Sequence, residues 1–360
     1  VILVGFNAGI LDENILNGPI ILILITCIVA SFATEKPAKK LIIETEDDSE
    51  SLLKSNGAAS EHILLPISNI EKIEKILEFA VLIKDKKSAN PVSLLSVVSN
   101  NEEAEINLLK TRNKLEEFVK QASATETKVN IITTLDHNAA SGITRISREI
   151  MADILILGWP QRTGFLDKLI GEKIDAILNN SNKTIFICQL EKPLVLHKRI
   201  IIAAPPLTEH ENGFSLWLNK FTKLAQELSI PMHIYCNEAT QKVMDKLLKK
   251  SKSNASVSFT HFTDWEDFLV LSRYINDDDL FVLVSARKGA TSYMSVLDNL
   301  PAKLKKYFNG NSRFVIYPQE FEDNYNAEPY NEFSSEPLNK GIEAVQKISK
   351  GLGSFLKKKE

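Results

Sequence analysis

The chain has 360 residues, of which 44% are hydrophobic and 25% are charged, and its formal net charge is -3. Because a folded domain of about 150 residues is typical, this length predicts two domains rather than one. Acidic and basic residues are interspersed and nearly balance, so the sequence offers no electrostatic attraction to DNA or RNA and argues against a nucleic-acid partner.

An uncharged, strongly apolar run of 21 residues occupies positions 14–34. At 1.5 Å per residue this length spans a bilayer core of about 30 Å. The charges before it, Asp12 and Glu13, are acidic, whereas a secretory signal peptide begins with basic residues. Three lysines follow the run closely, at Lys36, Lys39 and Lys40. We therefore expect a transmembrane helix at 14–34 and a cytoplasmic location for residues 35–360; the alternative is a buried helix of a soluble protein.

The chain then becomes polar and acidic over residues 35–60, without hydrophobic periodicity and with Gly, Ser and Asn near the end. This composition predicts a flexible linker. Val1 opens inside an apolar run rather than with Met, so we also expect the sequence to begin within a longer protein.

Between residues 61 and 192, short aliphatic runs alternate with helix-length amphipathic segments. This alternation is typical of a parallel sheet flanked by helices. Strands are expected at 62–68, 92–98, 128–134, 153–158 and 184–189. Helices are expected near 70–84, 103–122, 141–150 and 166–178.

The same pattern returns between residues 193 and 318. Strands are expected at 199–205, 231–236, 256–260, 279–285 and 313–318. Helices are expected near 214–228, 238–250, 265–273 and 292–308. The two halves are thus predicted to be tandem copies of one α/β fold with five-stranded parallel sheets, and such a repeat can pair internally.

Residues 319–360 form a polar, aromatic stretch followed by a candidate basic amphipathic helix from about residue 338. Such a helix could lie on an anionic lipid surface. The alternative is packing against the second half, because Gly341, Gly351 and Gly353 lower the helicity of an isolated segment.

Side chains that carry chemistry are sparse. The cysteines lie far apart in apolar runs and the six histidines show no metal-ligand spacing, so neither a disulfide framework nor a metal site is expected. The acidic pair Glu102 and Glu103 and the acidic run 277–279 stand at element starts, where carboxylates have structural roles. The three cysteines are Cys27, Cys188 and Cys236.

The segment after the fourth strand reads GWPQRTGFLDKLIGEKIDAIL. It resembles the universal stress protein family, whose nucleotide-binding members carry Gly, two residues, Gly, nine residues, Gly and Ser or Thr in this loop. The resemblance implies that Gly158 and Gly171 match the first and last glycines and Gly164 another loop glycine, while Val97 matches a second-strand position near the base. It implies a site for ATP or another adenine nucleotide; the alternative is that these glycines serve a tight turn and close packing.

The match to the nucleotide-binding pattern is incomplete. Gln161 replaces the second glycine, Glu172 replaces the hydroxyl residue, and Ser68 stands where the family has an acidic residue after the first strand. A carboxylate at residue 172 would repel a phosphate.

In the second half the corresponding loop departs further from the family. Ser285, Lys288 and Asp298 stand where the three glycines would be. Arg287 and Lys288 could attract an anion, or could be a solvated surface.

A closing transmembrane helix, a linker and two universal-stress-like domains together resemble the C-terminal region of Kef-type sodium or potassium/proton antiporters of the monovalent cation:proton antiporter-2 group, especially those of Bacteroidetes. The resemblance covers essentially the whole chain. It implies a multi-pass inner-membrane protein with residues 1–34 ending the transport domain, the antiporter core before Val1, contact with lipid, and a homodimer. It also implies a regulatory, non-enzymatic role.

Two other functions remain open from the sequence. One is a nucleotide-binding stress sensor, with two such domains attached to another transporter. The other is a membrane-anchored scaffold that supports structure or dimerisation.

Overall fold

The computed structural model describes residues 61–67, 73–122, 128–160, 172–251 and 253–319, together with Leu22, Ile25 and Thr26. Most of the expected membrane segment at 14–34, the linker at 35–60 and the tail from residue 320 lie outside the described residues. In the part of the chain that is described, no helix combines the length and the apolar character that crossing a membrane requires.

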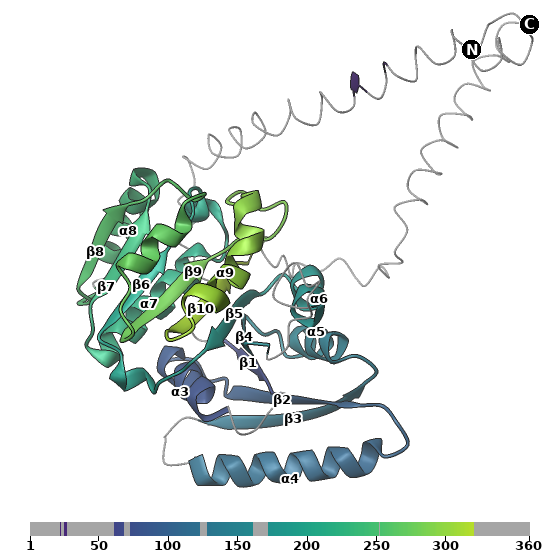
Figure 1. Ribbon diagram of the computed structural model, residues 1–360. Helices are drawn as coiled ribbons and strands as arrows, with labels where there is room; N and C mark the ends of the chain where they lie inside the picture. Colours follow the sequence, from purple (N-terminus) through teal and green to yellow (C-terminus); the bar gives the residue numbers. More distant parts are fainter. Residues whose placement is uncertain are drawn as a thin grey trace, which may run out of the picture. The chain divides into compact units, whose positions relative to one another are not determined.

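The first half alternates strands and helices as the sequence predicts (Figure 1). Its strands are β1 (Ile63–Pro66), β2 (Val92–Ser99), β3 (Val129–Asp136), β4 (Ile154–Gly158) and β5 (Thr184–Gln189). Its helices are α3 (Ile73–Ile83), α4 (Ala104–Ala122), α5 (Ala139–Glu149) and α6 (Glu172–Asn180). Asn138 caps α5 by accepting a hydrogen bond from the backbone N–H of Ala140, which satisfies a free donor of the first turn.

The second half repeats this order after a short 3-10 turn, η3 (Leu194–Leu196). Its strands are β6 (Arg199–Ala203), β7 (Met232–Cys236), β8 (Val257–His261), β9 (Asp279–Val284) and β10 (Ser312–Tyr317). Its α-helices are α7 (Phe214–Leu228), α8 (Glu238–Lys250) and α9 (Leu300–Tyr307). Its 3-10 turns are η4 (Thr208–His210), η5 (Phe268–Arg273) and η6 (Ser295–Asn299).

Two of the predicted helices differ from what forms. The segment 265–273 contains the 3-10 turn η5 rather than an α-helix. The segment 292–308 is divided between η6 and α9, and Pro301 lies at the start of α9, where a missing backbone N–H costs nothing and the fixed φ suits the first turn.

All ten strands belong to one sheet, in the order β3-β2-β1-β4-β5-β10-β9-β6-β7-β8. Pairing is parallel within each half and antiparallel between β5 and β10, where Val315 lies opposite Ile187 (Figure 1). The expectation of two separate five-stranded sheets is therefore wrong, although each half has the predicted parallel strands. The internal pairing covers two apolar strand edges that would otherwise be open to aggregation.

Helices cover both faces of this sheet. One buried cluster contains side chains of α3, α4, α7 and α8, and the other contains side chains of α5, α6, η5 and α9. Each cluster includes residues from both halves, so the hydrophobic cores are continuous across the β5–β10 seam. One compact unit therefore holds all ten strands.

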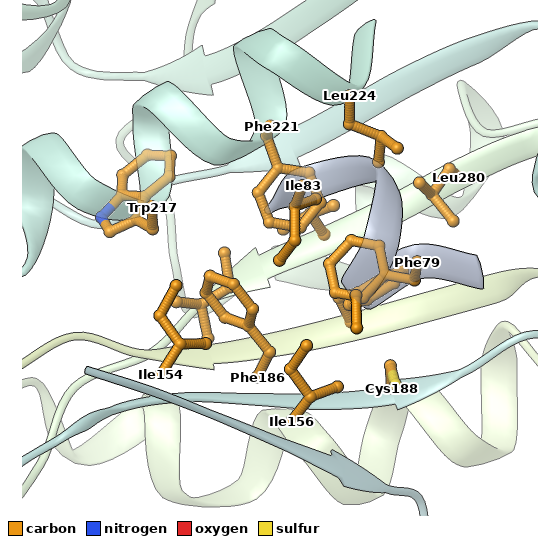
Figure 2. Close-up of a cluster of buried hydrophobic side chains, with 14 of the residues drawn as sticks. Phe79, Ile83, Ile154, Ile156, Phe186, Cys188, Trp217, Phe221, Leu224 and Leu280 are labelled. Atoms are coloured by element: carbon orange, nitrogen blue, oxygen red, sulfur yellow. The ribbon is translucent and has the colours of Figure 1, made fainter. Parts of the chain in front are cut away.

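Four phenylalanines form the centre of the seam on the α3–α7 face. Phe79 of α3 and Phe221 of α7 lie over Phe186 of β5 and Phe314 of β10, with ring centroids 4.6–6.1 Å apart. Figure 2 shows the two helices bringing their rings together above the strands, with Trp217 and Leu224 beside them. Rings at these distances add favourable edge-to-face contacts to the burial of apolar area.

Polar contacts also join the halves around this apolar seam. Lys220 of α7 forms an ion pair with Glu61 and donates a hydrogen bond to the carbonyl of Ile83 at 3.1 Å. On another part of the seam, a Cβ added to Gly213 of the second half would lie 2.8 Å from Oγ1 of Thr184 in the first half, so a larger residue would clash there. The halves are therefore fixed to each other by close backbone and side-chain contacts.

His197 lies buried directly after η3, where the chain passes from the first half to the second. Its Nδ1 lies 3.1 Å from the carbonyl of Leu194, and within the described residues its Nε2 has no hydrogen-bond partner. Burial, offset in part by this carbonyl, lowers the pKa of His197 below its usual value. The folded protein thus favours the neutral imidazole, since protonation would bury an N–H without an acceptor.

This burial predicts a pH-dependent stability. A lowered histidine pKa contributes stability that is present above the unfolded value of about 6.5 and is lost as the pH falls through the folded value. We expect the free energy of unfolding, measured by urea denaturation, to fall between pH of about 7.5 and about 5.5. The fall should be smaller in His197→Gln and unchanged in His137→Gln, a substitution at an exposed site. Equal pH slopes in all three proteins would contradict this role for His197.

Candidate functional site

Each half of the sheet has one point at which the strand order reverses, so that the connections on its two sides run in opposite directions across the sheet. In the first half this point lies between β1 and β4, and in the second between β6 and β9. Ligands of open parallel sheets bind in the crevice beyond the carboxyl ends of the strands at such a point. The two candidate sites are therefore the edge near Gly158 and the edge beyond Ala203 and Val284.

The structure places two of the four predicted nucleotide residues. Gly158 is the last residue of β4 and is exposed, and Val97 lies near the carboxyl end of β2, so both stand at the same edge of the sheet, on either side of β1. Gly164 and Gly171 lie outside the described residues, as do Ser68 and Gln161. Glu172, the replacement for the hydroxyl residue, is exposed at the start of α6.

The local structure does not explain why residue 158 is glycine. Its φ lies outside the left-handed region, and among the described residues a Cβ added there would closely approach only the end of the Ile76 side chain, at 3.3 Å. Against the described residues, alanine at this position would require only a small shift of the Ile76 side chain. Close approach by another group beyond β4 is a further physical reason for glycine.

Val97 has a clear packing role. Its side chain contacts the buried cluster on the α5 face, and its Cγ1 would lie 2.8 Å from a Cβ added to Gly142 of α5. Glycine at 142 thus lets α5 approach β2 closely. The side chain of Val97 is fully explained by this contact, and a ligand role would have to come from its backbone.

The crevice of the second half contains the protein's own polar side chains. Glu209 and Glu211 are both 4% exposed. Glu209 accepts a hydrogen bond of 2.6 Å from the hydroxyl of Thr240, and Glu211 accepts one of 2.8 Å from the backbone N–H of Ser292. Ser292 belongs to the loop after β9, which corresponds to the nucleotide loop of the first half. The carboxylate of Glu211 thus already accepts the hydrogen bond that a backbone N–H of this loop could donate to a ligand. The two buried carboxylates would also disfavour the binding of an anionic ligand.

The basic residues of that loop also have partners. Arg287 donates to the carbonyls of Ser181 and Lys183 at 3.2 and 2.6 Å, and to that of Pro318. Lys288 is exposed and lies 3.8 Å from Asp298. Arg287 therefore connects the second half to the first, rather than facing solvent as a free anion-binding group.

Sequence reasoning missed one contact at the start of the Gly158 loop. The guanidinium carbon of Arg313 lies 5.1 Å from the ring centroid of Trp159, and its Nη2 donates to Gln189 at 2.8 Å. Arg313 is only 1% exposed and comes from β10 of the second half. An arginine inside an otherwise apolar strand was the available signal, since a buried guanidinium requires partners.

The remaining reactive groups are held in structural roles. Burial raises the pKa of the Cys188 thiol, and it raises that of Cys236 to about 12, so neither is a thiolate at neutral pH. Asp279, in the acidic run, forms a bidentate pair with Arg199 at 3.0 and 2.7 Å. Within the described ranges no group of three or more His, Cys, Asp or Glu side chains could hold a metal ion.

The Arg287 contacts predict a change in stability. A lysine cannot reach three carbonyls with one ammonium group, so Arg287→Lys should lower the free energy of unfolding by about 2–4 kcal/mol. The measurement is urea denaturation followed by tryptophan fluorescence. Its matched control, Lys288→Gln, alters an exposed neighbour and should change stability by less than about 0.5 kcal/mol. Equal effects of the two substitutions would exclude a connecting role for Arg287.

Comparisons with known proteins agree with this architecture. The family model described as Universal stress protein family matches residues 59–189. A universal stress protein from Archaeoglobus fulgidus DSM 4304 superposes with a TM-score of 0.51 and 15% identity, over 74% of this chain and 98% of that one. That share exceeds either half alone, so the likeness of fold includes both halves.

Among curated proteins, the Na(+)/H(+) antiporter NhaS5 of Synechocystis sp. (strain ATCC 27184 / PCC 6803 / Kazusa) is 27% identical over 330 residues. The alignment covers 83% of this chain and 47% of the relative, so the chain spans about half the length of that protein. Residues 59–189 thus match the universal stress protein family, and most of the chain is similar to a sodium/proton antiporter, which confirms the resemblance inferred from the sequence.

Proposed function

We propose that this chain is the C-terminal regulatory region of a membrane monovalent cation/proton antiporter and that residues 61–319 catalyse no reaction. The observation that carries the proposal is the similarity to NhaS5 over 83% of the chain. Residues 61–319 make up a smaller share of the chain than this, so the similarity extends beyond the ten-stranded unit. A shared fold alone would not require that.

In this proposal the apolar run at 14–34 is the last transmembrane helix and residues 35–60 are the linker. The transport core, with the groups that exchange cation for proton, precedes Val1 in the same protein. Residues 35–360 lie on the cytoplasmic side of the cell membrane, and the two universal-stress-like halves, 61–192 and 193–318, act together. Lipid and a second copy of the chain are the further expected partners.

The described contacts suggest how such a unit could act on a transport core. Glu61 stands where the linker would join the fold, and its carboxylate is held by Lys220 of the opposite half. A movement of either half is therefore transmitted to the start of β1. Regulation requires a ligand or partner with different affinities for two transporter states, and the unit would convey that difference.

Two observations support the absence of catalysis. The described thiols are buried and protonated at neutral pH. The buried acids Glu209 and Glu211 are hydrogen-bonded to Thr240 and to the Ser292 backbone, as structural carboxylates are.

The test measures transport by the complete protein in everted vesicles from a bacterial host without its own sodium/proton antiporters. Sodium or potassium should dissipate a preformed proton gradient, followed with a pH-sensitive dye. Deleting residues 61–360 should preserve exchange but change the half-saturating cation concentration about fivefold or more. Lys220→Met should move the same parameter in the direction of the deletion, and Lys242→Met, at an exposed site on α8, should not.

Membrane levels of each variant are measured by immunoblot, so that a loss of protein is not mistaken for regulation. Absence of any cation-dependent proton flux would exclude the antiporter. Flux that is identical with and without residues 61–360 would exclude the regulatory role and favour a scaffold.

A second candidate function is nucleotide sensing by the first half. The observation that favours it is Gly158, which the packing of the described residues does not require to be glycine. The crevice beside it therefore remains a candidate for ATP or another adenine nucleotide, contacted by the loop backbone from Gly158 through Gly164 to Gly171 and by the backbone near Val97.

Titration of the 360-residue chain with ATP and AMP tests this second function. Binding should raise the unfolding temperature, and Gly158→Ala should weaken binding at least about tenfold because a Cβ would obstruct the approach of a phosphate. Gly310→Ala is the control, since a Cβ there meets its nearest atom at 3.5 Å. No thermal shift at about millimolar nucleotide would exclude the sensor.

A further inference from the structure

A groove lies at the seam of the two halves, away from both candidate crevices. It is a shallow, open hollow of about 280 Å³ between the loop that follows α3 and the middle of α7. Its lining is rich in lysine and consists of Asp85, Lys86, Lys87, Asn219, Lys220 and Lys223. We refer to these six residues as the lysine groove.

The lysine groove stands at the opposite edge of the first half from the Gly158 loop. Residues 84–91 connect the end of α3 to the start of β2, and the amino ends of parallel strands share one edge. Gly158 ends β4 and therefore lies at the carboxyl edge. A ligand in the groove would be separate from the nucleotide crevice expected in this fold.

The lysines of the groove differ in how their charges are balanced. Lys220 is 5% exposed and paired with Glu61, and Lys86 lies 2.9 Å from Glu227. By contrast, neither Lys223 nor Lys87 has a carboxylate within ion-pair distance in the described part of the chain. Lys223 donates to the carbonyl of Lys84, and Lys87 is exposed.

Lys223 is held in an unfavourable environment for a cation. Burial, and then the neighbouring charge of Lys220, lowers the pKa of Lys223, while Asp85, Glu227 and Glu61 act in the opposite direction more weakly. A charge that is partly desolvated without an ionic partner is costly. An anion beside Lys223 would remove that cost.

We propose that the lysine groove binds a phosphate-bearing anion. Lys87 and Lys223 supply ammonium donors from the two halves, and Asn219 adds an amide. Ammonium groups are common phosphate ligands. Its volume of about 280 Å³ lies at the small end of the range for ligand pockets and is sufficient for one or two phosphate groups.

Asp85 does not prevent this binding. Its Oδ1 accepts a hydrogen bond of 2.9 Å from the backbone N–H of Lys87, and this shapes the loop that carries the lysine. Glu61 and Glu227 are already engaged with Lys220 and Lys86. In the segments that the structure describes, Lys87 and Lys223 have no carboxylate partner, and Asp85 is the one carboxylate in the lining. The groove therefore carries a net positive charge.

An anion bound there would add a further connection between the two halves. Lys87 belongs to the first half and Lys223 to the second, so both sides of the seam would contact one ligand. The inference goes beyond the proposed function, because binding to the groove requires no transport core.

The test is calorimetric titration of the 360-residue chain, purified in a mild detergent, with inorganic pyrophosphate at constant ionic strength. Lys223→Gln and Lys87→Gln should each weaken binding about tenfold, which is the usual scale for losing one charge-assisted hydrogen bond. Lys87 is exposed, so its variant remains informative if Lys223→Gln folds poorly. Asp85→Asn keeps the acceptor for Lys87 N–H while removing a negative charge, and should tighten binding severalfold.

Two controls separate this site from others. Lys242→Gln, at an exposed site on α8 where Glu238 lies 2.8 Å away, should leave pyrophosphate binding unchanged. Gly158→Ala should also leave it unchanged, so failure of the nucleotide hypothesis does not affect this result. A lipid headgroup is distinguished from a soluble phosphate ester by sedimentation of the chain with vesicles of phosphatidylglycerol or of phosphatidylcholine alone.

Pyrophosphate binding that depends on Lys87 and Lys223 supports a soluble phosphate ester as ligand. Retention on phosphatidylglycerol vesicles that depends on the same lysines and is displaced by pyrophosphate supports a lipid headgroup. The proposal is overturned if pyrophosphate and vesicles both fail to bind, or if Lys242→Gln weakens binding as much as Lys87→Gln does.

Discussion

The antiparallel pairing of β5 with β10 is the interaction on which the rest of this structure depends. It converts two five-stranded sheets into one, and it brings Phe79 and Phe221 from opposite helices onto a shared apolar surface. Every other contact between the halves, from Lys220 with Glu61 to Arg287 with the Lys183 carbonyl, is possible only in this arrangement. An internal pair also has no concentration dependence, because its strands belong to one chain.

Because the two halves share a scaffold, their crevices can differ without loss of the fold. In the first half β4 ends in an exposed glycine that the packing of the described residues does not require. In the second half Glu211 binds the N–H of Ser292, so the equivalent loop is satisfied from within. The apolar side chains that hold the sheet together lie behind both edges and are unaffected by this difference.

Much of the fold could be predicted because its signals are local. Aliphatic runs of strand length such as 154–158 and 280–284, separated by amphipathic segments, identify parallel strands from the sequence alone. The union of the sheets could not be predicted in the same way, since a buried edge strand and a buried central strand have the same composition. The position of Gly158 at a strand end was predictable from its motif, whereas the partners of Arg287 in the first half lie about a hundred residues away and leave no pattern. The lysine groove likewise combines segments that are distant in sequence.

The position of β1 gives the structure a mechanical property. The strand is hydrogen-bonded on both sides, to β2 and to β4, and Glu61 at its start is held by Lys220 of α7. A force along the axis of β1 would load these hydrogen bonds in shear, so that several would have to break together. An edge strand under the same tension would separate one bond at a time. The central position of β1 thus makes its amino end a strong point of attachment for a force along the strand.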